Sequence, residues 1–111
     1  MNLKTFALMT LALALFVAIP AQLDAADAMA GKTSFLAKCK TCHAADGAGN
    51  AGMAKVLKVE IKHLGDPTVQ AKSDDDLKAV ITGGQGKMKA ISGLDGAAVD
   101  NIVAHIRTIK K

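Results

Sequence analysis

Two cysteines and a histidine before the middle of the chain have the types and spacing needed to hold a metal-containing ring. Cys39 and Cys42 are three positions apart, and His43 directly follows the second cysteine. On a helix, residues three or four positions apart share one face, so both thiols and the imidazole would point the same way. Two thioether bonds to a porphyrin and one axial nitrogen to its iron need this arrangement. The pattern is typical of c-type haem attachment.

Other uses of the two thiols fit the sequence less well. Cys39 and Cys42 are the only cysteines, and a disulfide between them would close a loop too short to stabilise the fold much. A thiol–disulfide exchange protein would place them in a βαβ pattern, and a zinc protein would add a second pair of ligands. The sequence predicts neither, so we interpret the motif as a haem attachment site.

The segment around Met88 is the best candidate for the opposite side of the iron. Met88 follows Gly83, Gly84 and Gly86 between two predicted helices, where we expect a flexible backbone that can wrap over a ring. The segment does not end in the Gly-Lys-Ser/Thr of a phosphate-binding loop. A neutral imidazole and a thioether close the iron on both sides and raise its potential, which favours electron transfer over substrate binding. We predict His43 as the proximal ligand and Met88 as the distal ligand.

Three other side chains could approach a haem. Met53 follows His43 by ten positions, which is too near for it to cross to the other face of the ring. His63 is interpreted as a surface histidine, with a place near a haem propionate as the alternative. His105 lies at the edge of an apolar stripe and is interpreted as a packing residue. Met88 itself has the alternative of being an ordinary core methionine.

The elements that must position these residues are predicted to be helices. Asp27 and Asp66 are N-cap candidates, and the second is followed by Pro67. Gly31 is explained by the close approach of another helix. Residues 44–66 are expected to form a loop with at most one helical turn. The predicted helices cover residues 27–43, a short segment from residue 66, residues 73–83 and residues 95–109.

The core that these helices can build is small. The chain has 111 residues, half of them hydrophobic, but no Trp or Tyr and only three Phe. A domain this small usually needs a staple or a metal, and a covalent haem would supply the missing large apolar group. The last predicted helix carries an apolar stripe at helical spacing. The stripe consists of Val99, Ile102, Val103, Ile106 and Ile109.

Charge argues against one class of partner and favours another. The net charge is +4, with no basic-aromatic stripe and no run of five like charges, which argues against nucleic acid. Lys38, Lys40, Lys87 and Lys89 flank the two segments expected to touch haem. They could ring its exposed edge and steer weak, salt-sensitive docking to an acidic redox protein, or they could be solvated lysines without a specific role.

The first 25 residues are typical of an export signal. Lys4 gives a positive start, residues 6–19 form an almost unbroken apolar run, and Pro20 ends it. The run is short for a membrane span, with an uncleaved anchor as the alternative. We expect a signal peptide over residues 1–25, with cleavage as late as residue 28, and a domain over residues 26–111. The mature protein would then lie in the bacterial periplasm without stable membrane insertion.

Together these residues resemble the monohaem class I cytochromes c, especially the short bacterial type. The resemblance covers nearly all of the chain after the signal. It rests on Gly31 and Phe35 before the haem motif, on residues 81–88 with the methionine, and on Leu94 and residues 102–107 near the end. It implies an all-α small cytochrome c fold. In that fold, crossed N- and C-terminal helices, one or two short helices and loops wrap one covalent haem c.

The function implied by this resemblance is electron transfer. Cys39 and Cys42 would form the haem thioethers, and His43 and Met88 would ligate the iron. The protein would carry one electron between redox proteins as a soluble exported carrier, and it would not be an enzyme by itself. The alternatives are a haem sensor or catalyst with an open iron, and a haem domain that docks on a larger oxidoreductase complex.

The chain also departs from the family pattern. Lys89 follows the methionine where many relatives have proline. Pro67 is the only proline after the signal, so no proline directly follows the haem motif to offer its carbonyl to the His43 ring N–H. His105 replaces an aromatic residue of the last helix. We expect these differences to affect the rigidity of the haem pocket and its redox potential more than the fold.

Overall fold

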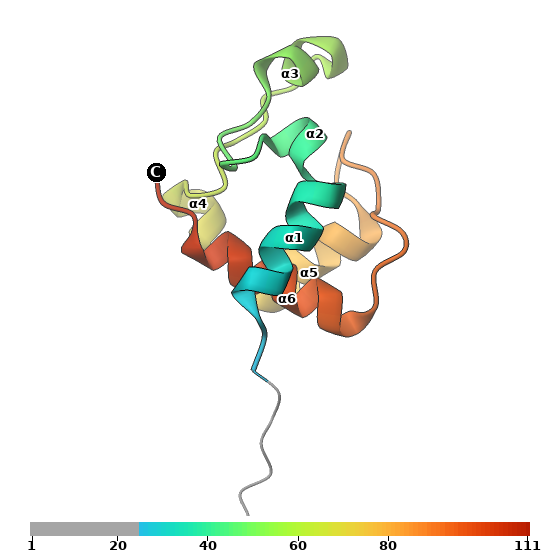
Figure 1. Cartoon of the computed structure of the whole chain (residues 1–111). Helices are drawn as coiled ribbons and strands as arrows, with labels where there is room; N and C mark the ends of the chain where they lie inside the picture. Colours follow the sequence, from blue (N-terminus) through green and yellow to red (C-terminus); the bar gives the residue numbers. More distant parts are fainter. Residues whose placement is uncertain (1–24) are drawn as a thin grey trace, which may run out of the picture.

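The computed structural model of the protein describes residues 25–111, and within them the regular elements are helices (Figure 1). They are α1 (Ala28–Lys38), α2 (Lys40–His43), α3 (Ala51–Leu57), α4 (Pro67–Gln70), α5 (Asp74–Gly83) and α6 (Gly96–Thr108). The predicted all-α fold is confirmed. None of these helices combines the length and the apolar composition needed to cross a membrane. Apart from Ala25, the predicted signal peptide lies outside the described residues.

Side chains just before the helices explain where most of them begin. The Asp27 carboxylate accepts hydrogen bonds from the N–H groups of Met29 and Ala30 at 2.9 and 3.2 Å. Each such cap satisfies N–H groups that the first turn of a helix leaves without a partner. The predicted caps at Asp27 and Asp66 are therefore confirmed. The side-chain caps are Asp27, Asn50, Asp66, Ser73 and Asp95.

Helices α1 and α6 cross at Gly31. A Cβ atom at this position would overlap the backbone carbonyl of Asn101, so only glycine permits the approach. The N–H of Asp27 donates to the side-chain oxygen of Asn101 at 2.7 Å, across 74 positions of sequence. The predicted close approach is confirmed, and it joins the first described helix to the last.

The core lies where α6 packs against α1 and α5. Phe35 and Ile102 are its most deeply buried large side chains, at 1% and 0% exposed. The predicted apolar stripe of α6 faces this core along its whole length. Burial of these apolar side chains is the main force that holds the helices together. The other buried apolar residues are Cys39, Leu77, Ile81, Val99, Val103, Ile106 and Ile109.

Arg107 fastens the end of α6 to the segment between α4 and α5. Its Nη1 and Nη2 donate to the carbonyls of Gln70 and Lys72 at 2.9 and 2.6 Å. Its Nε and Nη2 donate to Asp74 Oδ1 at 3.0 and 2.8 Å. Gln70 Nε2 in turn donates to the carbonyl of Ile106 at 3.0 Å. These bonds satisfy carbonyls that the helix ends leave open.

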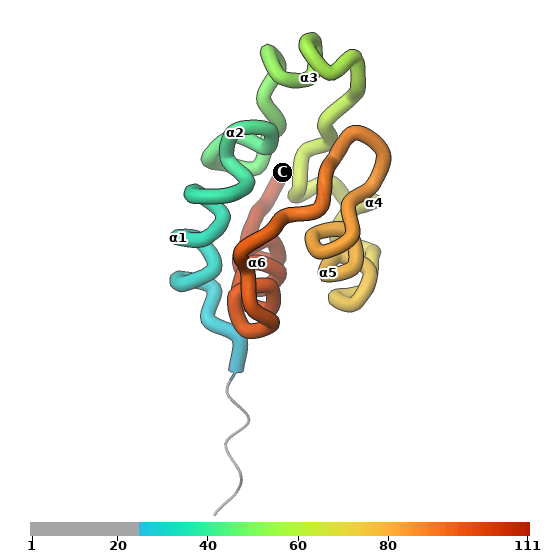
Figure 2. The backbone as a smooth tube through the Cα atoms, turned by 90° about the vertical axis from the view of Figure 1, so that its right-hand side faces the viewer, coloured from blue at the N-terminus to red at the C-terminus, as the bar shows by residue number. Residues whose placement is uncertain are grey.

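Two sequence-based boundaries are wrong. The predicted helix over residues 27–43 is divided at Cys39, which ends α1 and precedes α2. Residues 44–66, predicted as loop with at most one turn, contain α3, which stands above the body of the molecule in Figure 2. Helix α3 starts at the Asn50 cap, ends at Lys58 with φ 54°, and contains no buried residue. Because it buries nothing, no apolar period marks it in the sequence.

Candidate functional site

The two thiols and His43 lie on one helical turn. Cys39 has φ −117° and ψ −25°, so its φ departs from helical geometry and breaks α1 from α2, while its ψ stays near the helical value. Its carbonyl accepts from the N–H groups of Cys42 and His43 at 3.3 and 3.0 Å. Both cysteines are free thiols. The three side chains therefore come from a single turn, in agreement with the spacing of the motif.

The surroundings of Cys39 keep its thiol protonated. The side chain is 8% exposed, and burial, with a smaller contribution from Cys42, raises the pKa of the Cys39 thiol to about 11. Thiol–disulfide oxidoreductases do the opposite, because their Cys-X-X-Cys sites lower a cysteine pKa to favour the reactive thiolate. The site therefore does not have the electrostatics of a thiol exchange centre.

His43 is held as a neutral ring. Burial lowers its pKa, and its Nδ1 is buried without a hydrogen-bond partner among residues 25–111. The ring of Phe35 lies 6.5 Å from it, centroid to centroid, at 43°. A histidine must be neutral to bind a metal. Packing rather than a hydrogen bond orients this imidazole.

Asn50 organises the backbone directly after the haem motif. Its N–H donates to the carbonyl of Cys42 at 2.8 Å, and its side-chain amide donates to that of Thr41 at 3.1 Å. Its side-chain oxygen caps α3. The sequence analysis missed this residue, although an Asn followed by helix-compatible residues is a recognisable N-cap signal. Asn50 thus links the motif to the segment that stands over it.

Met88 lies between α5 and α6, as predicted, and the loop there forms a tight hairpin. The N–H of Met88 donates to the carbonyl of Gln85 at 2.9 Å, and the N–H of Gln85 donates back to that of Met88 at 2.8 Å. The Met88 side chain is half-buried. In Figure 2, α2 and this hairpin loop lie on opposite sides of the molecule, below α3. The segments that carry His43 and Met88 are therefore separated in this view.

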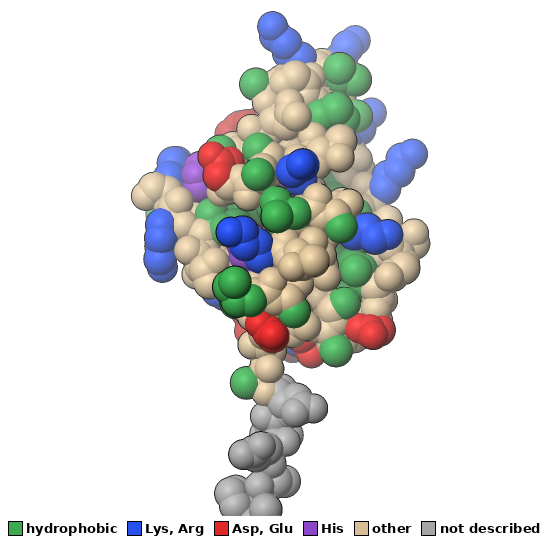
Figure 3. All heavy atoms as spheres, viewed as in Figure 1, with side chains coloured by type: hydrophobic (Ala, Val, Ile, Leu, Met, Phe, Trp, Pro, Cys, Tyr) green, Lys and Arg blue, Asp and Glu red, His purple; other side chains and the backbone are tan. Residues whose placement is uncertain are grey.

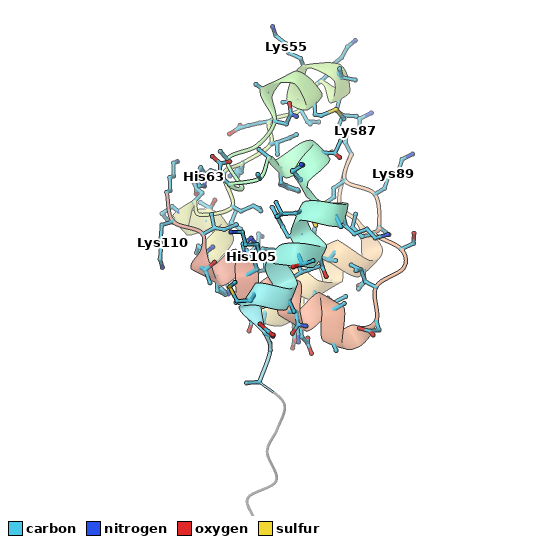
Figure 4. All side chains as sticks on the ribbon, viewed as in Figure 1. Lys55, His63, Lys87, Lys89, His105 and Lys110 are labelled. Carbon is cyan, nitrogen blue, oxygen red and sulfur yellow. The ribbon has the colours of Figure 1, made fainter. Side chains whose placement is uncertain are left out.

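The other two described histidines, His63 and His105, take part in hydrogen bonding and packing within the fold (Figure 4). His63 Nδ1 accepts from the N–H of Gly65 at 2.9 Å, so this ring supports a turn. His105 is buried with its ring centroid 5.1 Å from that of Phe35, which confirms its prediction as a packing residue. Its Nε2 is buried without a partner among the described residues, and burial, then the charge of Lys32, lowers its pKa.

The lysines named in the sequence analysis are all exposed. Lys87 and Lys89 come from the hairpin loop and point away from the body (Figure 4). On the face shown in Figure 3, basic side chains lie along the upper, right-hand and left-hand edges, whereas acidic side chains lie at the lower edge and at the upper left. The remaining two of the set are Lys38 and Lys40.

The donors in this region fit a c-type haem. They are two reduced thiols, a neutral imidazole and a thioether, which is the set that such a haem takes. The buried, unpartnered ring nitrogen of His43 also suits an imidazole that is oriented by packing to serve as a ligand.

Comparison with known proteins identifies the family. The family model described as cytochrome c oxidase, cbb3-type, subunit III matches residues 26–106. The chain belongs to the class I cytochromes c. Cytochrome c-554(547) of Halothiobacillus neapolitanus is 33% identical over 91 residues, which cover 78% of this chain and all of that protein. The solved structure of the KustC0563 c-type cytochrome has a TM-score of 0.62 and 28% identity, covering 73% of this chain and 98% of that one.

Membership in this family confirms the predicted resemblance and the helical cytochrome fold. As a c-type cytochrome, the protein binds haem c and transfers electrons to redox partners. Cys39, Cys42, His43 and Met88 remain the predicted haem-binding residues.

Proposed function

We propose that this cytochrome is a soluble, exported one-electron carrier with a single covalent haem. Cys39 and Cys42 would hold the haem through thioethers, and His43 and Met88 would be its axial ligands. When bound, the haem supplies a one-electron iron couple. The observation that carries the proposal is the presence of both thiols and a neutral imidazole on one turn, with Met88 in an ordered hairpin on the other side of the molecule.

Different side chains would attach the haem and occupy the two axial positions of its iron. Cys39 and Cys42 anchor the ring on α1 and α2, while burial keeps His43 unprotonated. Met88 closes the remaining side, so no position stays open for a substrate. A closed site passes electrons through its exposed edge and has no catalytic step of its own, which is why we assign no enzymatic activity.

The proposed partner is a redox protein with an acidic docking surface. Lys38, Lys40, Lys87 and Lys89 are exposed around the segments that would touch the haem. The Nζ atom of Lys38 lies beside Gly93, in the loop that follows the hairpin. Such a basic rim raises the rate of encounter with an acidic partner more than it strengthens the complex.

We further propose that residues 1–25 are a cleaved signal peptide, with cleavage as late as residue 28, and that residues 26–111 work in the bacterial periplasm. A second candidate is a haem domain that docks on a larger oxidoreductase complex. The match to a family model described as an oxidase subunit favours this alternative. A third alternative is a haem sensor or catalyst with an open iron. The ferric spectrum described in the next paragraph distinguishes it from an electron carrier.

The test uses the full chain produced in a host that attaches haem c. After denaturing electrophoresis, the wild-type band should stain for haem, and Cys39→Ser combined with Cys42→Ser should abolish the stain. The ferric protein should show a methionine-sulfur charge-transfer band that disappears in Met88→Ala and persists in the matched control Met53→Ala. A high-spin ferric spectrum in the wild type would overturn the proposed ligation and favour the open-iron alternative.

A further inference from the structure

The hairpin that carries Met88 is closed by a pair of backbone hydrogen bonds. Gln85 and Met88 exchange N–H···O bonds of 2.8 and 2.9 Å and form an isolated antiparallel bridge. Gly86 and Lys87 make the turn between them, and Gly86 has φ 56°. A two-residue turn of this kind needs a residue that accepts positive φ, as glycine does. Both backbone polar groups of Met88 are therefore engaged within the hairpin.

Gly84 lies where the two arms of the hairpin pass each other. Its φ is 79°, and a Cβ atom there would lie 2.7 Å from the carbonyl oxygen of Met88 and 2.8 Å from the nitrogen of Ala90. Both neighbours are backbone atoms, so no side-chain rotation can relieve the contact. Any residue other than glycine would strain its own backbone and also push the arm containing Met88 outward.

The base of the hairpin is fixed to α5 on both sides. The N–H of Gly84 donates to the carbonyl of Val80 at 2.8 Å, and the N–H of Ile91 donates to that of Ile81 at 2.9 Å. Ile81 is in the buried core. A displacement at Gly84 therefore cannot be absorbed by moving the whole loop, and it must appear in the Met88 arm.

We propose that Gly84 is a positioning residue for the Met88 thioether. By leaving room for the Met88 arm, it lets the hairpin close, and the closed hairpin limits how far Met88 can leave the iron. Lys89 follows Met88, so no proline fixes the backbone after the ligand. The hydrogen-bonded hairpin supplies that restraint instead. The inference rests on the proposed role of Met88 as distal ligand.

The test compares glycine-to-alanine changes at neighbouring positions in the haem-loaded protein. Gly84→Ala introduces the contact and the positive-φ strain, and Gly83→Ala is the matched control, because a Cβ at Gly83 meets nothing within 4 Å. Added imidazole competes for the iron only when Met88 detaches. We expect imidazole to bind Gly84→Ala about tenfold more tightly than wild type, with a weaker methionine-sulfur band. Gly83→Ala should bind imidazole as wild type does.

The outcomes separate the inference from the proposed ligation. If the wild type shows the band and Gly84→Ala matches Gly83→Ala in imidazole affinity, the positioning role is overturned while the ligation stands. If the wild type lacks the band, the ligation fails and the inference falls with it.

A second measurement needs no variant and covers the case in which Gly84→Ala does not fold. In the haem-loaded wild type, the amides of Gln85 and Met88 should exchange with solvent far more slowly than that of Lys87 at the turn. Equal exchange rates at these three amides would overturn the closed hairpin and, with it, the role of Gly84.

Discussion

His105 is a titratable ring within the apolar core, and this position links folding to pH. Burial lowers its pKa, so below the ordinary histidine pKa of about 6.5 the unfolded chain binds a proton that the folded chain does not. The stability associated with a neutral His105 is therefore fully present above that pH. It is lost as the pH falls toward the lowered pKa of the folded state.

We predict that His105→Phe reduces the acid sensitivity of the haem-loaded protein. One such group gives a slope of at most about 1.4 kcal/mol of unfolding free energy per pH unit. Urea unfolding at pH 7.5 and pH 5 measures the difference. An identical loss of stability in wild type and His105→Phe would contradict the prediction.

Single residues differ in how much of their role the sequence reveals. The spacing of Cys39, Cys42 and His43 is itself the signal, since the chemistry demands that spacing. The role inferred for Gly84 has no such signal, because its neighbours are the carbonyl of Met88 and the nitrogen of Ala90, which only the folded backbone brings together. The hairpin around Met88 could not be predicted for the same reason: glycine composition does not distinguish a mobile segment from a tight hairpin.

At the scale of the helices, the crossing of α1 and α6 requires a residue without a Cβ atom at position 31. We predict that Gly31→Ala destabilises the haem-loaded protein by about 1–3 kcal/mol, because the added Cβ overlaps the backbone of Asn101. Chemical unfolding followed by far-ultraviolet circular dichroism gives the measurement. Gly96→Ala, at the start of α6 with nothing within 4 Å of its Cβ, should change stability little. Equal effects of the two changes would show that the helices can move apart.

The helices that could be predicted are those whose sequences carry both a cap and a buried face. Helix α6 has Asp95 before it and an apolar stripe along it, so its extent is close to the predicted one. Helix α3 has the Asn50 cap but no buried residue, so no apolar period marks it. The break at Cys39 also leaves no local signal, because the residues on both sides of it are compatible with one continuous helix.

At the scale of the whole molecule, charge is unevenly distributed. Asp74, Asp75 and Asp76 lie in the first turn of α5, and acidic residues pair within the fold, as Asp100 does with Lys78 at 2.7 Å and Asp74 with Arg107 at 2.8 Å. The exposed lysines at the hairpin have no such pairing among the described residues. These unpaired charges support the proposed docking of an acidic partner on the hairpin side.

We predict that electron transfer to an acidic redox protein slows as salt increases, and that Lys87→Glu slows it about tenfold at low ionic strength. Stopped-flow mixing at several salt concentrations gives the rates. Lys110→Glu makes the same charge change on the opposite side of the molecule in Figure 4 and should have little effect. Rates that do not depend on salt, or equal effects of both changes, would contradict a directed docking surface.

The packing of the first described helix on the last implies an order of assembly. Asp27 and Asn101, 74 positions apart, must both be present before α1 and α6 can pack, so the core closes only when nearly the whole chain is available. Once it has closed, Cys39 is 8% exposed and its thiol keeps its proton. The proposed thioether requires a haem vinyl group to react with this sulfur, and such a group would reach it more easily on the open chain. We therefore expect haem loading to come first, and the docking of the C-terminal helix to be the last step of maturation.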